Sequence, residues 1–128
     1  MTHSFDLLVN YEDTDMGGIV YHANYLRYIE RARSDWVRAL GVDQMKMRDE
    51  GVVFAVRKVD SDYLAPTRFE DALTIETQVV EVSGARLTLD QVVLRDGRAV
   101  FTAQVVIVAI DLSGRPTRLP AEIRALAG

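Results

Sequence analysis

The sequence contains no cysteine. Disulfides, thiolate zinc sites and cysteine nucleophiles are therefore excluded, and any chemistry must come from carboxylates, histidine, hydroxyl groups or the backbone. No apolar run approaches the roughly 18–20 residues that a membrane-spanning helix needs. The N-terminus also lacks the basic region and apolar core of a secretory signal. These absences predict a cytoplasmic protein without a membrane span.

The chain also has no excess of basic residues, and its formal net charge is −4. Broad nucleic-acid binding depends on clustered Lys and Arg, so this charge argues against a nucleic-acid partner. The chain has no P-loop, no dinucleotide-binding fingerprint and no G-x-S-x-G elbow. The two histidines, His3 and His22, lack the spacing of zinc ligands. We therefore expect neither a metal nor another cofactor.

The residues that are present have the balance of one soluble globular domain. At 128 residues, with 48% hydrophobic and 27% charged residues, the chain is long enough to bury one core. We find no internal repeat, low-complexity segment or linker, so residues 1–128 are expected to form a single domain.

The periodicity predicts a strand, a long helix and then four more strands. Alternation predicts a strand over residues 4–11, and apolar residues at spacings of three and four predict an amphipathic helix over residues 24–40. Asn24 is the expected N-cap of this helix and Gly41 its expected stop. A weaker helical segment covers residues 42–51.

The second half of the sequence reads as long antiparallel strands. They are expected at residues 52–64, 71–83, 86–96 and 98–111, and Asp96-Gly97 matches the preference of tight hairpin turns. A terminal helical turn follows Pro120. This order predicts an α+β fold in which the helix lies across a curved sheet. Because an exposed edge strand must be covered, we expect at least a dimer.

The stretch YEDTDMGGIVYHANY, between the first strand and the helix, combines carboxylates with a glycine pair. Gly17 and Gly18, which follow Asp15, permit backbone conformations that a Cβ forbids. The helix that follows begins with N–H groups that lack partners within the helix, and its dipole favours negative charge. Such a helix start can stabilise an oxyanion. The loop is therefore a candidate active site, although Asp and Gly are also ordinary turn residues.

Two further polar residues have more than one interpretation. His22 is a substrate contact, a general base, or a residue that only hydrogen-bonds to backbone near the helix start. Glu30 is a second candidate carboxylate, but Arg27 and Arg33 at three-residue spacing favour a surface ion pair.

The run YEDTDMGGIVYHANYLRYIERAR, residues 11–33, resembles the signature of the 4-hydroxybenzoyl-CoA thioesterase family of hotdog-fold proteins. It is closest to the acyl-CoA thioesterase branch associated with the Tol-Pal system. The D-x-D pair, the glycine, V-Y-H-A-N-Y and E-R-A-R occur together and in order, and YLAPTRFEDALTIET, residues 63–77, is also similar. The resemblance implies a hotdog fold, with a five-stranded antiparallel sheet wrapped around one long central helix.

The resemblance also implies roles for residues of the loop. Asp15 would be the catalytic carboxylate and Asp13 would be structural. The backbone N–H of His22 would polarise the thioester oxygen, with Gly18 and Val20 near the acyl and thioester groups.

Further substrate-binding candidates lie outside the loop. Tyr25 on the helix has the apolar character expected of an acyl pocket. The family's active sites lie at a dimer interface, which implies that Val59, Ser61 and Asp62 of a partner subunit complete the pocket. Some members bind coenzyme A phosphates with a basic cluster between the third and fourth strands, where this chain retains only Arg86.

The expected function is hydrolysis of an acyl-CoA thioester to free acid and coenzyme A by a homodimer or by a tetramer built as a dimer of dimers. One alternative is an enzyme acting on acyl carrier protein thioesters. Another is a non-catalytic hotdog module that binds acyl-CoA. A dehydratase is disfavoured, because its chemistry places a histidine and a carboxylate differently.

Overall fold

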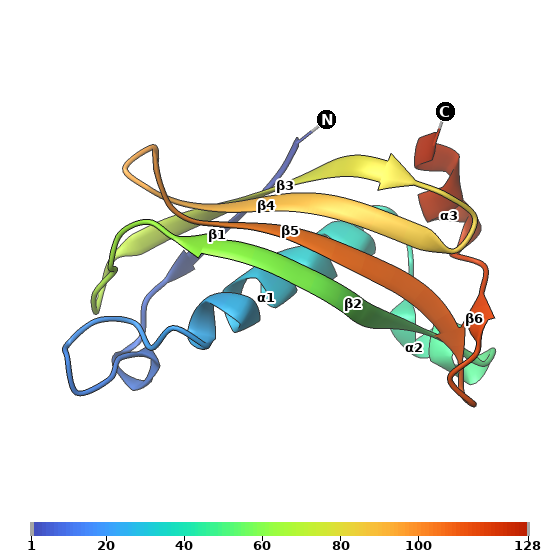
Figure 1. Cartoon of the computed structure of the whole chain (residues 1–128), viewed down its shortest axis with the longest axis horizontal. Coiled ribbons are helices and arrows are strands. Elements are labelled where there is room, and N and C mark those ends of the chain that lie inside the picture. Colours follow the sequence, from blue (N-terminus) through green and yellow to red (C-terminus); the bar gives the residue numbers. More distant parts are fainter. Residues whose placement is uncertain (1, 128) are drawn as a thin grey trace.

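The computed structural model describes residues 2–127 as one curved antiparallel sheet with a long helix on its concave side (Figure 1). The strands are β1 (Thr2–Leu8), β2 (Val52–Tyr63), β3 (Ala72–Val82), β4 (Arg86–Arg95), β5 (Arg98–Asp111) and β6 (Pro116–Thr117). The helices are α1 (Asn24–Ala39), α2 (Gln44–Asp49) and α3 (Ala121–Arg124), with 3-10 turns at Tyr11–Asp13 and Ala125–Ala127. No helix of residues 2–127 is long and apolar enough to cross a membrane. The cytoplasmic location stays a prediction.

The sheet has six strands, so the predicted count of five is wrong. Its order is β1-β3-β4-β5-β2, and β6 pairs with β5 beside this path. β4 accompanies β5 only as far as Val108, and β6 pairs with the next two residues, Ala109 and Ile110. β6 has two residues, too few to show the alternation by which a strand is recognised. The helices α2 and α3 confirm the weaker helical segment predicted over residues 42–51 and the terminal turn predicted after Pro120, and they add to the one long helix of the hotdog fold implied by the resemblance.

The hairpin between β4 and β5 confirms the turn predicted from Asp96-Gly97. Both residues have positive φ angles, 52° and 76°, as a primed turn requires. The meander of β3, β4 and β5 therefore forms from neighbouring segments, whereas β1 and β2 pair with distant strands and form the two edges of the sheet.

The ends of α1 are defined differently from each other. Gly41 has a φ of +89° and ends the helix as predicted, with its N–H bonded to the carbonyl of Arg38 at 3.0 Å. The prediction for Asn24 is wrong, because Ala23 is the N-cap and no side chain of residues 2–127 caps the start of the helix. The Asn24 side chain is buried and donates to the carbonyl oxygen of Asp13 at 2.8 Å, so it fixes the preceding loop instead.

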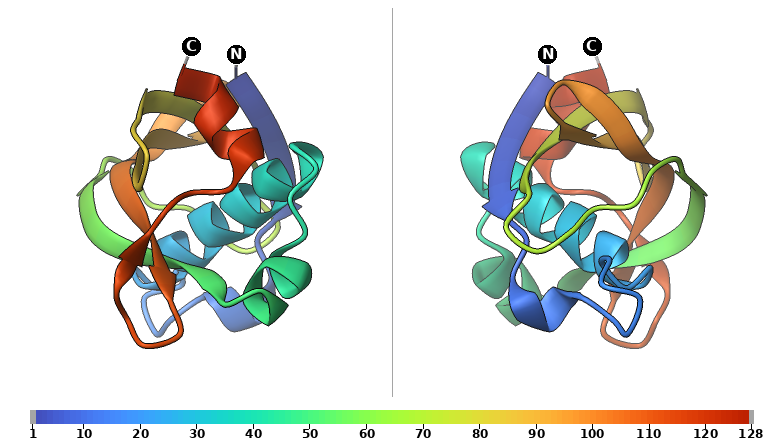
Figure 2. Two further views of the ribbon diagram at one scale, coloured as in Figure 1. Left: turned by 90° about the vertical axis from the view of Figure 1, so that its right-hand side faces the viewer. Right: turned by 90° about the vertical axis from the view of Figure 1, so that its left-hand side faces the viewer.

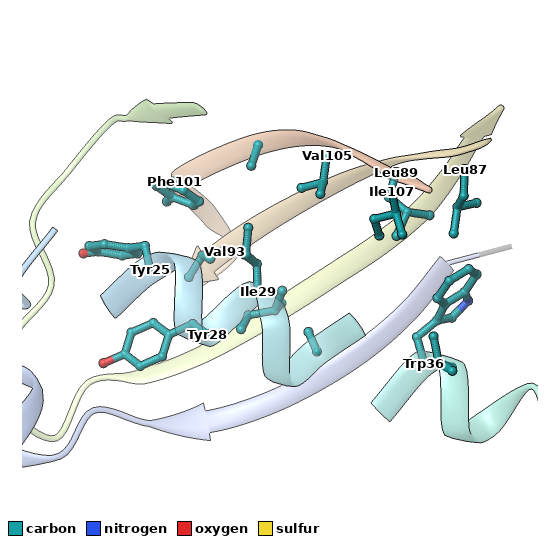
Figure 3. Close-up of a cluster of buried hydrophobic side chains, with 14 of the residues drawn as sticks. Tyr25, Tyr28, Ile29, Trp36, Leu87, Leu89, Val93, Phe101, Val105 and Ile107 are labelled. Carbon is teal, nitrogen blue, oxygen red and sulfur yellow. The ribbon is translucent and has the colours of Figure 1, made fainter. Parts of the chain in front are cut away.

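The core lies between α1 and the concave face of the sheet (Figures 2 and 3). Apolar side chains at helical spacing face the side chains that alternate inward along β4 and β5. The labelled set in Figure 3 is Tyr25, Tyr28, Ile29, Trp36, Leu87, Leu89, Val93, Phe101, Val105 and Ile107. Burial of these side chains holds the helix against the sheet and fixes the position of its first turn.

The helix leaves part of β2 uncovered, because α1 packs mainly against β1, β3 and β4. Val56 and Val59 pair with the buried Ile107 and Val105 of β5, so they share the concave face with them. They are nevertheless 50% and 37% exposed, and Tyr63 at the end of the strand is 49% exposed. β2 is therefore both an unpaired edge and an uncovered apolar face.

Candidate active site

The chain leaves β1 earlier than predicted, and it does so through a capped turn. Asn10 and Asp13 form a reciprocal capping box around the turn Tyr11–Asp13, in which the N–H of Asn10 donates to Asp13 Oδ2 at 2.9 Å. Tyr11, expected to end a strand over residues 4–11, lies in this turn instead; it is exposed and packs edge-on against Phe69.

Asp13 is the centre of the hydrogen bonds that hold the loop against α1. Its buried Oδ2 also accepts from the hydroxyl of Tyr28 at 2.9 Å, and burial together with this carboxylate raises the pKa of Tyr28. Its carbonyl oxygen accepts from the N–H of Tyr21 at 2.9 Å and from the Asn24 amide. Oδ2 and the carbonyl oxygen of this buried residue each accept two hydrogen bonds from the protein itself, which is the arrangement of a structural carboxylate.

Asp15 lies two residues further and is exposed. Its N–H donates to the carbonyl of Ile19 and its own carbonyl accepts from Gly18, closing a tight turn in which Gly18 has a φ of +77°. Oδ1 accepts from the N–H of Gly17 at 2.9 Å, but no described residue donates to Oδ2. The turn thus holds one carboxylate oxygen and leaves the other available.

The first turn of α1 presents two further unused groups. The N–H of Asn24 donates to the carbonyl of Tyr21 at 2.8 Å, so His22 and Ala23 are the central residues of a turn. Neither of their N–H groups donates to another described residue. Because no described side chain caps the start of the helix, these donors and the positive end of the dipole are available to stabilise an anionic oxygen.

A shallow pocket of about 460 Å³ joins the aspartate to this turn. Its residues come from the loop, the first turn of α1 and the segment that follows β2. They are Asp15, Ile19, Val20, His22, Tyr25, Tyr63, Leu64, Ala65 and Pro66. A carboxylate and a helix start therefore open into one pocket whose other lining is mainly apolar, which suits an ester or thioester with an apolar acyl group.

Two hydrogen bonds tie the pocket's walls together. The hydroxyls of Tyr25 and Thr67 lie 2.6 Å apart, and burial raises the pKa of Tyr25. The carbonyl of Thr67 accepts from the N–H of Val20 at 2.8 Å. The Tyr25 ring also stacks on Phe101 of β5 with a centroid distance of 5.0 Å. The pocket is thus anchored to the core of the domain.

The structure brings together some of the residues predicted from sequence but not others. Those that line the pocket are Asp15, Val20, His22 and Tyr25, while Gly18 shapes the turn beside it. Those that lie elsewhere in the protomer are Val59, Ser61, Asp62 and Arg86. Val59 and Ser61 lie on the concave face of β2, Asp62 lies on the opposite face, and exposed Arg86 begins β4 at the far end of the sheet.

Sequence reasoning missed the wall formed by residues 63–66. Tyr63 and Leu64 are half exposed although they are large and apolar. An aromatic-aliphatic pair followed by proline at the end of an expected edge strand was the available signal, because proline stops such a strand. His22 contributes its backbone, and its exposed ring makes no hydrogen bond with the described residues.

The expected ion pair of Glu30 is wrong. Glu30 instead accepts from the hydroxyl of Ser34 at 2.8 Å, and no described base lies within 4.0 Å of its carboxylate. Arg33 turns inward and donates to the buried side chain of Gln91 at 3.0 Å, and burial lowers the pKa of Arg33.

Glu30 and Arg33 border a second cavity of about 220 Å³ between α1 and β2, separate from the Asp15 pocket. In residues 2–127 no cluster of three His, Asp or Glu side chains suits a metal ion.

Comparison with known proteins identifies the family. Residues 9–126 match the thioesterase-like superfamily. The chain is 38% identical to the acyl-CoA thioesterase YbgC of Haemophilus influenzae over 124 residues, which cover 95% of this chain and 91% of that protein. It is 40% identical to the acyl-CoA thioester hydrolase YbgC of Escherichia coli over 119 residues, covering 91% and 89%.

A solved structure agrees with these sequence matches. The probable thioesterase of Bartonella henselae superposes with a TM-score of 0.90 at 34% identity, covering 94% of this chain and 100% of that one. The family predicted from residues 11–33 is confirmed, and so is the hotdog arrangement of an antiparallel sheet with a long helix. The chain belongs to the thioesterase-like superfamily of hotdog-fold proteins.

Proposed function

We propose that this protein is an acyl-CoA thioesterase, which converts an acyl-CoA and water to a free acid and coenzyme A. The observation that supports this most is the free Oδ2 of Asp15 beside the uncapped start of α1, in a pocket with apolar walls. The relatives described above are named for the same activity.

The geometry supports separate roles for the helix start and for Asp15 at the thioester group. The thioester oxygen accepts a hydrogen bond from the N–H of His22, so negative charge that develops on it meets the positive end of α1. Oδ2 of Asp15 then either attacks the carbonyl carbon, giving an anhydride that water hydrolyses, or removes a proton from an attacking water. Either route breaks the C–S bond, and the sulfur leaves as the thiol of coenzyme A after taking up a proton.

We further propose that two copies pair through β2. This strand has a free edge and exposed apolar side chains, the combination that proteins protect by association. Antiparallel pairing of identical edges reverses one copy. If the axis of this pairing lies near the Tyr63 end of β2, Val59 and Ser61 of the partner subunit lie beside the pocket, and Arg86 of the partner subunit lies toward the Asp15 end, where it can meet coenzyme A phosphates.

Substitution Val59→Lys is expected to separate the subunits, because it places a charge in the apolar centre of the interface. Light scattering coupled to gel filtration should then show a monomer, and thiol release should fall by roughly 10²-fold because half of each pocket is lost. Val80→Lys is the matched control, since Val80 is an exposed valine on β3, away from the proposed interface. A wild type that is active as a monomer would contradict the proposed interface.

The function is tested by release of free thiol from short, long and aromatic acyl-CoA substrates. Parallel assays with acyl carrier protein thioesters compare the two carriers. A much higher kcat/KM for the carrier-protein thioesters than for acyl-CoA would show that they are the substrates and that the proposed substrate class is wrong. If acyl-CoA binds in calorimetry but no thiol is released from any substrate, the protein is a binding module and the proposed activity is wrong.

A further inference from the structure

Tyr63 connects the edge strand β2 to the start of α1. Its hydroxyl donates to the carbonyl oxygen of His22 at 3.0 Å, a contact between residues 41 positions apart. Its ring meets those of Phe101, Tyr25 and His22 edge-on, with centroid distances of 5.0, 5.6 and 6.2 Å. Aromatic packing therefore fixes where the hydroxyl points.

The carbonyl of His22 depends on this hydroxyl for its position. The other donor that reaches it among the described residues is the N–H of Tyr25, at a long 3.4 Å. The bond from Tyr63 is thus the better of the two. It fixes the peptide plane between His22 and Ala23, in the middle of the turn whose two N–H groups are unused.

A hydrogen bond accepted by a carbonyl also polarises the N–H of the same peptide group. We infer that Tyr63 is a positioning residue for this turn: its bond to the His22 carbonyl polarises the N–H of Ala23, a second oxyanion donor, and fixes the backbone from which the N–H of His22 donates. It acts through the backbone and need not touch the reacting atoms. This inference rests on the proposed function, because it assumes that the turn stabilises a thioester oxygen.

The structure separates this role from a role in stability. Tyr63 is half exposed at the end of an edge strand, and its ring contacts do not involve the hydroxyl. Phenylalanine retains those contacts, so Tyr63→Phe removes the hydrogen bond while leaving the packing in place. Tyr21→Phe is a matched control, because Tyr21 is also half exposed and neighbours His22, but its hydroxyl bonds to no described residue.

The test combines kinetics with backbone NMR. In Tyr63→Phe, kcat for acyl-CoA hydrolysis should fall about three- to tenfold, the effect of one neutral hydrogen bond, while KM changes less than about twofold. The amide proton of Ala23 should move upfield as its peptide loses polarisation. Tyr21→Phe should show neither the kcat loss nor an upfield shift of this size.

The outcomes are distinguishable. An active wild type whose kcat and Ala23 amide are unchanged in Tyr63→Phe overturns the inference and leaves the proposed function standing. A fall in kcat with a lowered melting temperature and an unmoved Ala23 amide indicates a structural role and also overturns it. A wild type that releases no thiol overturns the proposed function, and the inferred positioning role of Tyr63 with it.

Discussion

Asp15→Asn is expected to lower kcat by about 10²–10⁴-fold, the range for loss of an acid-base group, with little change in KM or stability. The amide cannot attack a thioester or accept a proton as a carboxylate does. The substitution is nearly isosteric, and its oxygen can still accept the hydrogen bond from Gly17 that holds the turn. Thiol release measured against substrate concentration gives kcat and KM, and thermal unfolding checks the fold.

A nearby exposed carboxylate provides the control for this experiment. Glu12→Gln removes the same charge three residues away, outside the pocket, and should leave kcat within about twofold of wild type, because exposed charges act weakly at a distance in water. If folded Asp15→Asn is as active as wild type, Asp15 is not the catalytic carboxylate, and the mechanism proposed above is wrong even though the activity stands.

Asp13→Ala is expected to have the largest effect on stability, lowering the free energy of unfolding by about 3–5 kcal/mol. Alanine leaves the buried hydroxyl of Tyr28 and the N–H of Asn10 without their acceptor. The melting temperature should drop by roughly 10–20 °C for a domain of this size. Chemical denaturation followed by circular dichroism measures the change.

Asp13→Asn separates the hydrogen bonds from the charge. The amide oxygen can accept both bonds, so the loss of stability should be about half that of Asp13→Ala. Asp13→Asn should also retain far more activity than Asp15→Asn when both are assayed well below their unfolding temperatures. Equal stability of Asp13→Ala and wild type would show that the buried carboxylate is not structural.

The local chemistry of the sequence was enough to predict most elements of the fold. The alternating and helical periods located α1 and the long strands, and Asp96-Gly97 and Gly41 marked a hairpin and a helix end because few residues adopt positive φ. The prediction failed where an element was too short to show a period, as in β6. It also failed at Asn24, whose side chain satisfies a carbonyl of the loop rather than the helix start.

The candidate site was predictable only in part, because some of its residues are close in the sequence and others are brought together only by the fold. Asp15 and His22 lie within one continuous stretch, so their proximity follows from the chain itself. The opposite wall at Tyr63 comes from a strand 41 residues away, and only the sheet order shows that the end of β2 meets the start of α1. Arg86 was assigned from a family pattern, and its distance from Asp15 within one protomer follows from its place at the far end of β4.

The order of the strands has a consequence for how fast the pocket forms during folding. β3, β4 and β5 are joined by short turns, so their pairing closes small loops and should occur early. β1 joins β3 across a much longer loop, for example where Gln78 bonds to Thr2 over 76 residues, and such contacts form slowly. The pocket needs the loop after β1 and the end of β2 together. We therefore expect the meander to gain protection from hydrogen exchange first, and hydrolytic activity to return only with the slowest refolding phase.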